Sequence, residues 1–120
     1  MKAHVLILGV IALSVVFSSP ASAQPASGQS AKPKITFKGG PGDKPETAVI
    51  ILGAPNSMAG IAAEYNYLRR KFGRKQVDWR LTRQSVFNQQ GKVYDRLELE
   101  LKDGSRKTVF FDISEFFGKL

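Results

Sequence analysis

Side chains that could carry out proton transfer or covalent chemistry are scarce in this 120-residue sequence. It contains no Cys, and its one His is His4, close to the N-terminus. The later serines Ser57, Ser85, Ser105 and Ser114 therefore have no imidazole to activate them, and none begins a Ser-x-x-Lys sequence. Because the usual proton carrier at neutral pH is missing, we predict that the protein is not an enzyme.

Metal ligands after residue 4 are limited to carboxylates. Asp95, Asp103 and Asp112 do not follow the spacing of a calcium-binding loop. Glu98 and Glu100 alternate along a predicted strand beside basic residues, which is more typical of a solvated charge ladder than of a glycosidase pair. We therefore expect no metal, no cofactor and no catalytic residue.

The chain is basic, with 18 Lys and Arg against 10 Asp and Glu and a net charge of +8. The densest basic stretch runs from residue 69 to residue 83, and its one acid is Asp78. One interpretation is contact with an anionic envelope polymer or a partner protein, with nucleic acid less favoured. The other is that cations stabilise the end of a helix and keep a small protein soluble. The candidate binding residues are Arg69, Arg70, Lys71, Arg74, Lys75 and Arg80.

The N-terminal segment, residues 1–23, has the pattern of a secretory signal peptide. Lys2 precedes an apolar run over residues 5–17, and Ala21-Ser22-Ala23 provides small residues for cleavage. As a helix the run is about 20 Å long, shorter than the roughly 30 Å of membrane hydrocarbon. We expect cleavage after Ala23, a periplasmic or secreted protein, and no membrane span in the mature chain.

Two zones follow the predicted cleavage point. Residues 24–45 are rich in Pro, Gly, Ser and Lys and are predicted to form a flexible leader. Their one apolar cluster, residues 35–37, could alternatively pair onto the edge of a sheet. Residues 46–120 are predicted to form a single domain.

The domain begins with a β-branched apolar run, residues 48–52, which predicts a buried strand. A helix is expected next, with Asn56 or Ser57 as its N-cap and Gly73 at its C-terminal end. Near the C-terminus, one residue of the Phe116-Phe117 pair is expected to fold onto the core. The predicted apolar stripe of the helix consists of Met58, Ile61, Ala62, Tyr65, Leu68 and Phe72.

The remaining chain alternates apolar and polar residues in three runs, which predicts a β-meander. For Trp79 and Leu81 to share a face with Leu99 and Leu101, the first hairpin loop must contain an odd number of residues. Residues 89–91 and 102–104 each provide three residues ending in Gly. We therefore predict an α+β fold with two layers, one amphipathic helix on an antiparallel sheet, in the order β-α-β-β-β.

On the polar face of this meander the register predicts that Glu100 lies opposite Arg106. Gln84 is expected on the same polar face. Arg83 and Asp95 are expected as a diagonal pair on the otherwise apolar face.

The order of elements resembles that of cystatins, which are small exported inhibitors of cysteine proteases. Residues 64–66 (Glu-Tyr-Asn) and 84–86 (Gln-Ser-Val) are similar to parts of the pattern of that family. The resemblance implies an inhibitor that acts through its hairpin loops. Two hypotheses result: a small exported non-catalytic binding or accessory protein with a basic contact surface, and a cystatin-like inhibitor of a protease or other hydrolase.

Overall fold

The computed structural model describes residues 34–120, so the predicted signal peptide and residues 24–33 of the predicted leader lie outside the described residues. The predicted α+β class is confirmed, with one α-helix and a five-stranded sheet. None of the helices within residues 34–120 is long and apolar enough to span a membrane. The elements are β1 (Thr36–Gly39), the 3-10 helix η2 (Pro45–Thr47), β2 (Val49–Leu52), α1 (Ser57–Phe72), β3 (Trp79–Gln89), β4 (Lys92–Leu101) and β5 (Arg106–Asp112).

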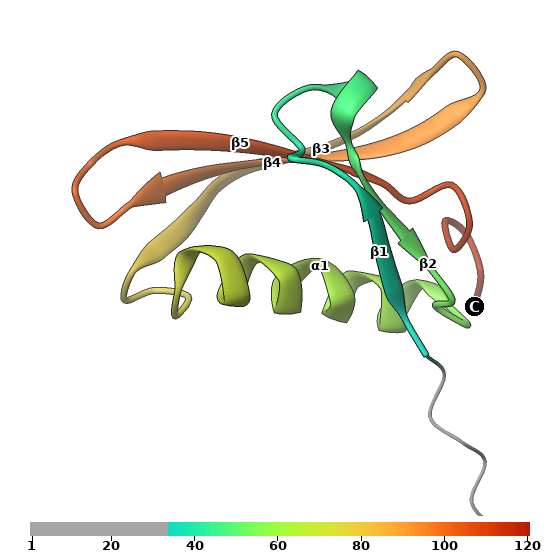
Figure 1. Ribbon diagram of the computed structural model, residues 1–120, viewed down its shortest axis with the longest axis horizontal. Helices are drawn as coiled ribbons and strands as arrows, with labels where there is room; N and C mark the ends of the chain where they lie inside the picture. Colours follow the sequence, from blue (N-terminus) through green and yellow to red (C-terminus); the bar gives the residue numbers. More distant parts are fainter. Residues whose placement is uncertain (1–33) are drawn as a thin grey trace, which may run out of the picture. The chain divides into compact units, whose positions relative to one another are not determined.

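The sheet is mixed, in the order β1-β2-β5-β4-β3, and it arches over α1, which covers its concave face (Figure 1). The predicted meander accounts for β3, β4 and β5, which are antiparallel. The prediction of a wholly antiparallel sheet is wrong, because β2 pairs in parallel with β5. Helix α1 therefore connects β2 to β3 at the far edge of the sheet.

Strand β1 lies within the segment that was predicted to be a flexible leader. It pairs antiparallel with β2, with Thr36 opposite Leu52 and Phe37 opposite Ile51. The ring of Phe37 packs against Tyr67 of α1, with the ring centroids 5.4 Å apart. The structure thus shows the edge pairing that the sequence left as an alternative, because partial burial of Phe37 against the core helps to offset the entropy of ordering the strand.

Helix α1 begins where expected, since Asn56 Oδ1 accepts a hydrogen bond from the backbone N–H of Ala59 at 2.8 Å. Its predicted stripe is only half right. Leu68 is buried, but Met58 and Ile61 are 82% and 45% exposed. The reason is that Gly60, which has no side chain, contacts the ring of buried Phe116, so the helix turns this side towards the core. The buried residues of α1 are Gly60, Ala63, Glu64 and Leu68.

The core lies between α1 and the concave face, and the predicted shared face of the meander is confirmed. Trp79 lies opposite Leu101, and Leu81 lies opposite Leu99. The predicted folding of one C-terminal Phe onto the core is also confirmed, because Phe116 is buried while Phe117 is exposed. The members of this core cluster from β3, β4, β5 and the residue after β5 are Trp79, Leu97, Leu99, Val109, Phe111 and Ile113.

The hairpin loops differ in how well they were predicted. The loop at residues 102–104 has the expected three residues, and the backbone N–H of Leu101 donates to Ser105 O at 2.8 Å. The first loop has two residues instead of three, because Gln89 pairs with Lys92. The register requires an odd number of unpaired residues between β3 and β4, and a β-bulge at Thr82 supplies the third one.

The bulge exchanges the faces of the residues that follow it. Arg83, expected on the apolar face, lies opposite Glu98 on the convex face. Gln84, expected on the polar face, lies opposite Leu97 on the concave face. The predicted pair of Arg83 and Asp95 is therefore wrong, and the Gln84 side chain takes the place of Arg83 beside Asp95, with Nε2 donating to Oδ2 at 2.8 Å.

Candidate functional site

Five cations gather where α1 ends. Arg69, Arg70 and Lys71 form its last turn, and Arg74 and Lys75 follow in the loop to β3. All five are exposed, and within residues 34–120 none forms an ion pair. The one acid of the stretch, Asp78, accepts a hydrogen bond from the backbone N–H of Arg74 at 2.7 Å. We call Arg69, Arg70, Lys71, Arg74 and Lys75 the helix-end cations.

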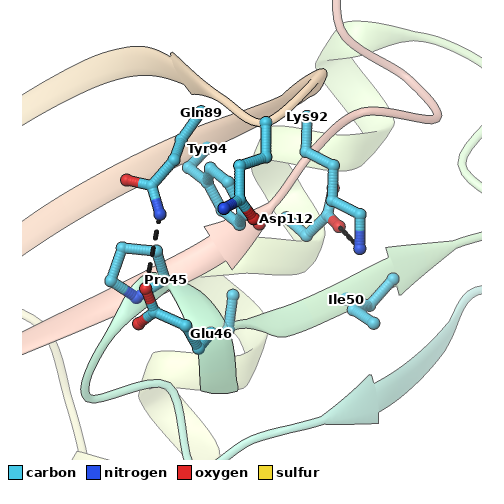
Figure 2. A pocket seen from close by; sticks show the side chains of 9 residues that line it. Pro45, Glu46, Ile50, Gln89, Lys92, Tyr94 and Asp112 are labelled. Atoms are coloured by element: carbon cyan, nitrogen blue, oxygen red, sulfur yellow. Dashed lines mark hydrogen bonds and ion pairs between the residues drawn. The ribbon is translucent and has the colours of Figure 1, made fainter.

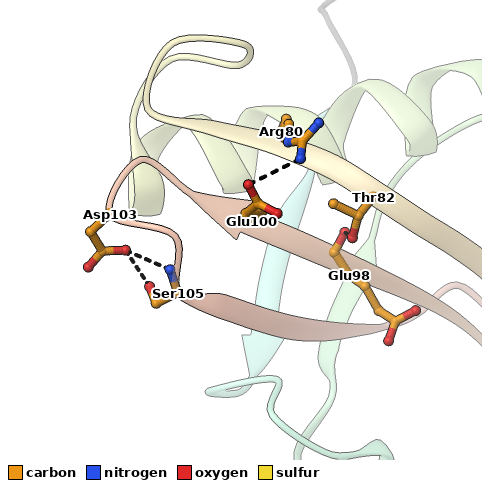
Figure 3. Close-up of polar contacts among 6 residues, drawn as sticks. All are labelled: Arg80, Thr82, Glu98, Glu100, Asp103 and Ser105. Carbon is orange, nitrogen blue, oxygen red and sulfur yellow. Dashed lines mark hydrogen bonds and ion pairs between the residues drawn. The ribbon is translucent and has the colours of Figure 1, made fainter.

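The sixth predicted residue, Arg80, lies elsewhere. It projects from β3 on the convex face of the sheet, where its guanidinium lies 3.1 Å from Glu100 Oε1 (Figure 3). Two further ion pairs occupy this face, Arg83 with Glu98 at 3.7 Å and Lys92 with Asp112 at 4.0 Å. The structure therefore brings together five of the six predicted residues and pairs the sixth with a carboxylate.

Aromatic rings hold three of the helix-end cations in place. The Arg70 guanidinium lies 5.3 Å from the centre of the Phe37 ring, on the side of the helix that faces β1. Lys71 Nζ lies 5.6 Å from the centre of the Phe72 ring and donates to Pro41 O at 3.1 Å. Lys75 Nζ lies 4.4 Å from the centre of the Tyr65 ring. Such contacts are attractive without neutralising the charge, so the cations remain available to an external anion.

A small cavity of about 180 Å³ opens beside two of these cations. Tyr65 and Trp79 form an aromatic wall, with their rings nearly parallel and the centroids 6.5 Å apart. Burial raises the pKa of the Tyr65 phenol, and the neighbouring Glu64 adds to this, so the wall carries no charge near neutral pH. The lining residues are Ala62, Tyr65, Asn66, Arg69, Lys75 and Trp79, which include no acid.

A carboxyl pair lies buried between α1 and the sheet, and sequence reasoning missed it. Glu64 and Asp95 are 1% and 2% exposed. Burial raises the pKa of Glu64 to about 10, and the hydrogen bond and charge of Asp95 contribute further. Glu64 is therefore protonated at neutral pH and can donate to Asp95, whose other oxygen accepts from Gln84. The pair is closed off from solvent, so we assign it a structural role.

The available signal for this pair was the position of Glu64. It lies next to Ala63 and four residues before Leu68, on the face that the structure buries. Asp95 was placed on the apolar face from the sequence, and that placement is confirmed by its burial. The partner was misassigned because the bulge at Thr82 could not be located from the pattern alone.

A second cavity, of about 280 Å³, lies on the convex side between η2 and the first hairpin (Figure 2). Gln89 Nε2 donates to Glu46 Oε1 at 3.4 Å across its rim. Asp112 Oδ1 accepts hydrogen bonds from the backbone N–H and the hydroxyl of Ser114, so this carboxylate stabilises the turn after β5. The walls come from segments far apart in the chain, so no local motif indicated this cavity. They are Pro45, Glu46, Ala48, Ile50, Gln89, Gln90, Lys92, Tyr94 and Asp112.

Comparison with known proteins does not identify the family of this chain. No protein-family model matches the chain, no curated protein matches it, and no solved structure matches it. Within residues 34–120 no three His, Cys, Asp or Glu side chains lie close enough together to hold a metal ion. The functional argument therefore depends on the charges and cavities described above.

Proposed function

We propose that this is a small exported, non-catalytic binding protein that contacts an anionic envelope component or an acidic partner through the helix-end cations. One observation carries the proposal. The five cations at the end of α1 have no carboxylate partner within residues 34–120, whereas Arg80, Arg83 and Lys92 on the sheet each have one. An unpaired cluster of like charges creates a positive potential that attracts anions.

Stabilisation of the helix end accounts for only part of this cluster. Cations in the last turn interact favourably with the negative end of the helix dipole, which applies to Arg69, Arg70 and Lys71. Arg74 and Lys75 lie beyond Gly73, which ends the helix with a φ of 102°. Because the dipole effect falls off within one turn, these two cations point to an external partner instead.

The distribution of the cations favours an extended anion. Arg70 faces β1, while Arg69 and Lys75 line the cavity beside Tyr65. A polymer or an acidic protein surface could contact both sides of the helix end at once. Nucleic acid is less favoured, because bases bind single-strand proteins by stacking on free rings. The rings of Phe37 and Tyr65 already lie beneath cations.

The inhibitor hypothesis has less support. It requires hairpin loops that act together, and the loops of the meander are at residues 90–91 and 102–104. Consecutive hairpins of a meander lie at opposite ends of the strands, as Figure 1 shows for the β3–β4 and β4–β5 loops. They therefore cannot enter one cleft of an enzyme together.

The test compares two variants of the mature chain that lose the same charge. R70Q/K71Q/R74Q removes three helix-end cations, and R80Q/R83Q/K92Q removes the three paired cations of the sheet. Binding to heparin, as a sulfated polymer probe, is measured by titration at low and high salt. We expect at least about a tenfold loss of affinity for the first variant and near-unchanged affinity for the second. Equal losses would show that net charge alone matters and would overturn the proposal.

A further inference from the structure

On one side of α1, apolar side chains are not covered by any other part of residues 34–120. Met58, Ile61 and Ala62 are exposed, although their spacing is that of a buried stripe. Tyr65, one turn after Ile61, stacks on Trp79 at the start of β3. Residues four apart lie on the same side of a helix, so this apolar side runs along β3.

Within residues 34–120, strand β3 forms an unpaired edge of the sheet and is 11 residues long. After the bulge and Arg83, residues 84–90 contain no charge and no Pro, and Val86 is 49% exposed. Natural edge strands are usually protected by charges, Pro or short length. The opposite edge, β1, has only four residues and carries Lys38, so the two edges differ in protection.

The uncovered helix side and the open edge adjoin each other. Val86 lies opposite Asp95 in the sheet, on the concave face. Asp95 lies beside Glu64, which follows Ile61 by three residues on α1. Val86 and Ile61 therefore flank the same contact between sheet and helix. We call Met58, Ile61, Ala62 and the edge at residues 84–90 the β3 surface.

We infer that the β3 surface binds the same surface of a second copy, forming a two-fold dimer in which the two β3 strands pair antiparallel. An antiparallel register centred on Val86 places Val86 opposite Val86 and Gln84 opposite Asn88. It also places Arg83 opposite Gln89, so no two like charges face each other. This self-complementarity of an uncharged edge favours a second copy over a charged partner. The inference is independent of the proposed anion binding.

The absence of Cys from the sequence allows a direct cross-linking test. Directly opposite residues of antiparallel strands have Cα atoms about 4.5–5.5 Å apart, within the range of a disulfide. Val86→Cys in the full mature chain is oxidised with oxidised glutathione as the electron acceptor. Val77→Cys is the matched control, because Val77 is 48% exposed but precedes the strand. We expect covalent dimer to form at least about tenfold faster for Val86→Cys, and equal rates would overturn the inference.

Sedimentation equilibrium provides the second measurement. We expect the mature chain to dimerise with increasing concentration, and Val86→Lys to raise the dissociation constant at least about tenfold. Val77→Lys should leave it unchanged. Because Val86 is half-exposed, the lysine should not unfold the monomer, which circular dichroism checks. A chain that stays monomeric up to about 1 mM, or a dimer that Val86→Lys does not weaken, would contradict the inference.

Discussion

On the convex face of the sheet, Arg80 and Arg83 of β3 each form an ion pair with a glutamate of β4, whereas within residues 34–120 the helix-end cations form none. Both groups belong to the same basic stretch of the sequence. What separates them is strand register, because pairing with β4 supplies Glu98 and Glu100 at regular intervals. A count of charges along the chain therefore identifies a basic region but does not show which of its cations are available to a partner.

A large effect on stability is expected at the contact that anchors α1. Phe116 is buried against Gly60 in the first half of α1. Phe116→Ala should lower the free energy of unfolding by about 3–5 kcal/mol, since it leaves a cavity beneath the helix. Urea unfolding measures this, with exposed Phe117→Ala as the matched control. A loss below about 1 kcal/mol would show that Phe116 does not anchor α1.

The next prediction separates the pH dependence of stability from that of anion binding. Glu64 keeps its proton up to about pH 10 in the folded chain, but its ordinary pKa is 4.5. Between these values folding takes up a proton, so stability should fall as pH rises, by roughly 1.4 kcal/mol per pH unit. Glu64→Gln should remove this slope. Urea unfolding at pH 5, 7 and 9 measures it.

The exposed substitution Glu98→Gln is the control and should retain the slope of the wild-type chain. If Glu64→Gln also retained it, Glu64 would not be the proton-binding group. Glu64 is 1% exposed, so its proton does not contact an anion bound at the helix-end cations. Anion affinity should therefore stay constant while stability changes.

The sequence predicted the features of the fold that depend on periodicity and parity. Trp79, Leu99 and Val109 each belong to a run in which every second residue is apolar, so their shared buried face followed directly. For the apolar residues of β3 and β4 to share a face, the number of unpaired residues between the two strands must be odd. A three-residue loop satisfies this requirement, and so does a two-residue loop with a bulge at Thr82. Because the three-residue loop was predicted instead of the bulge, Arg83 and Gln84 were each predicted on the wrong face of the sheet.

The candidate site was predictable only in part for the same reason. The run from Arg69 to Lys75 is local, and the end of a helix exposes it, so five of the six residues lie together. Arg80 is set apart by its pairing with Glu100, which depends on contacts between strands. The exposure of Met58 and Ile61 was missed because spacing defines a stripe without showing whether a neighbour covers it.

The smallest expected effect concerns the paired cations. A double-mutant cycle with Arg80→Gln and Glu100→Gln should give a coupling free energy of about 0.2–1 kcal/mol, because both side chains are partly solvated. The same cycle between Arg74 and Glu100 should give none, as a reference for unpaired charges. Coupling of equal size in both cycles would remove the distinction between the paired cations of the sheet and the helix-end cations.

The most direct test of the account is a residue-resolved nuclear magnetic resonance titration of residues 24–120 with a sulfated oligosaccharide. The account predicts that amide shifts concentrate at residues 69–75, weaken as salt is added, and leave the strand residues around Arg80, Arg83 and Lys92 unchanged. Shifts of equal size on the convex face of the sheet, or none at the end of α1, would contradict it.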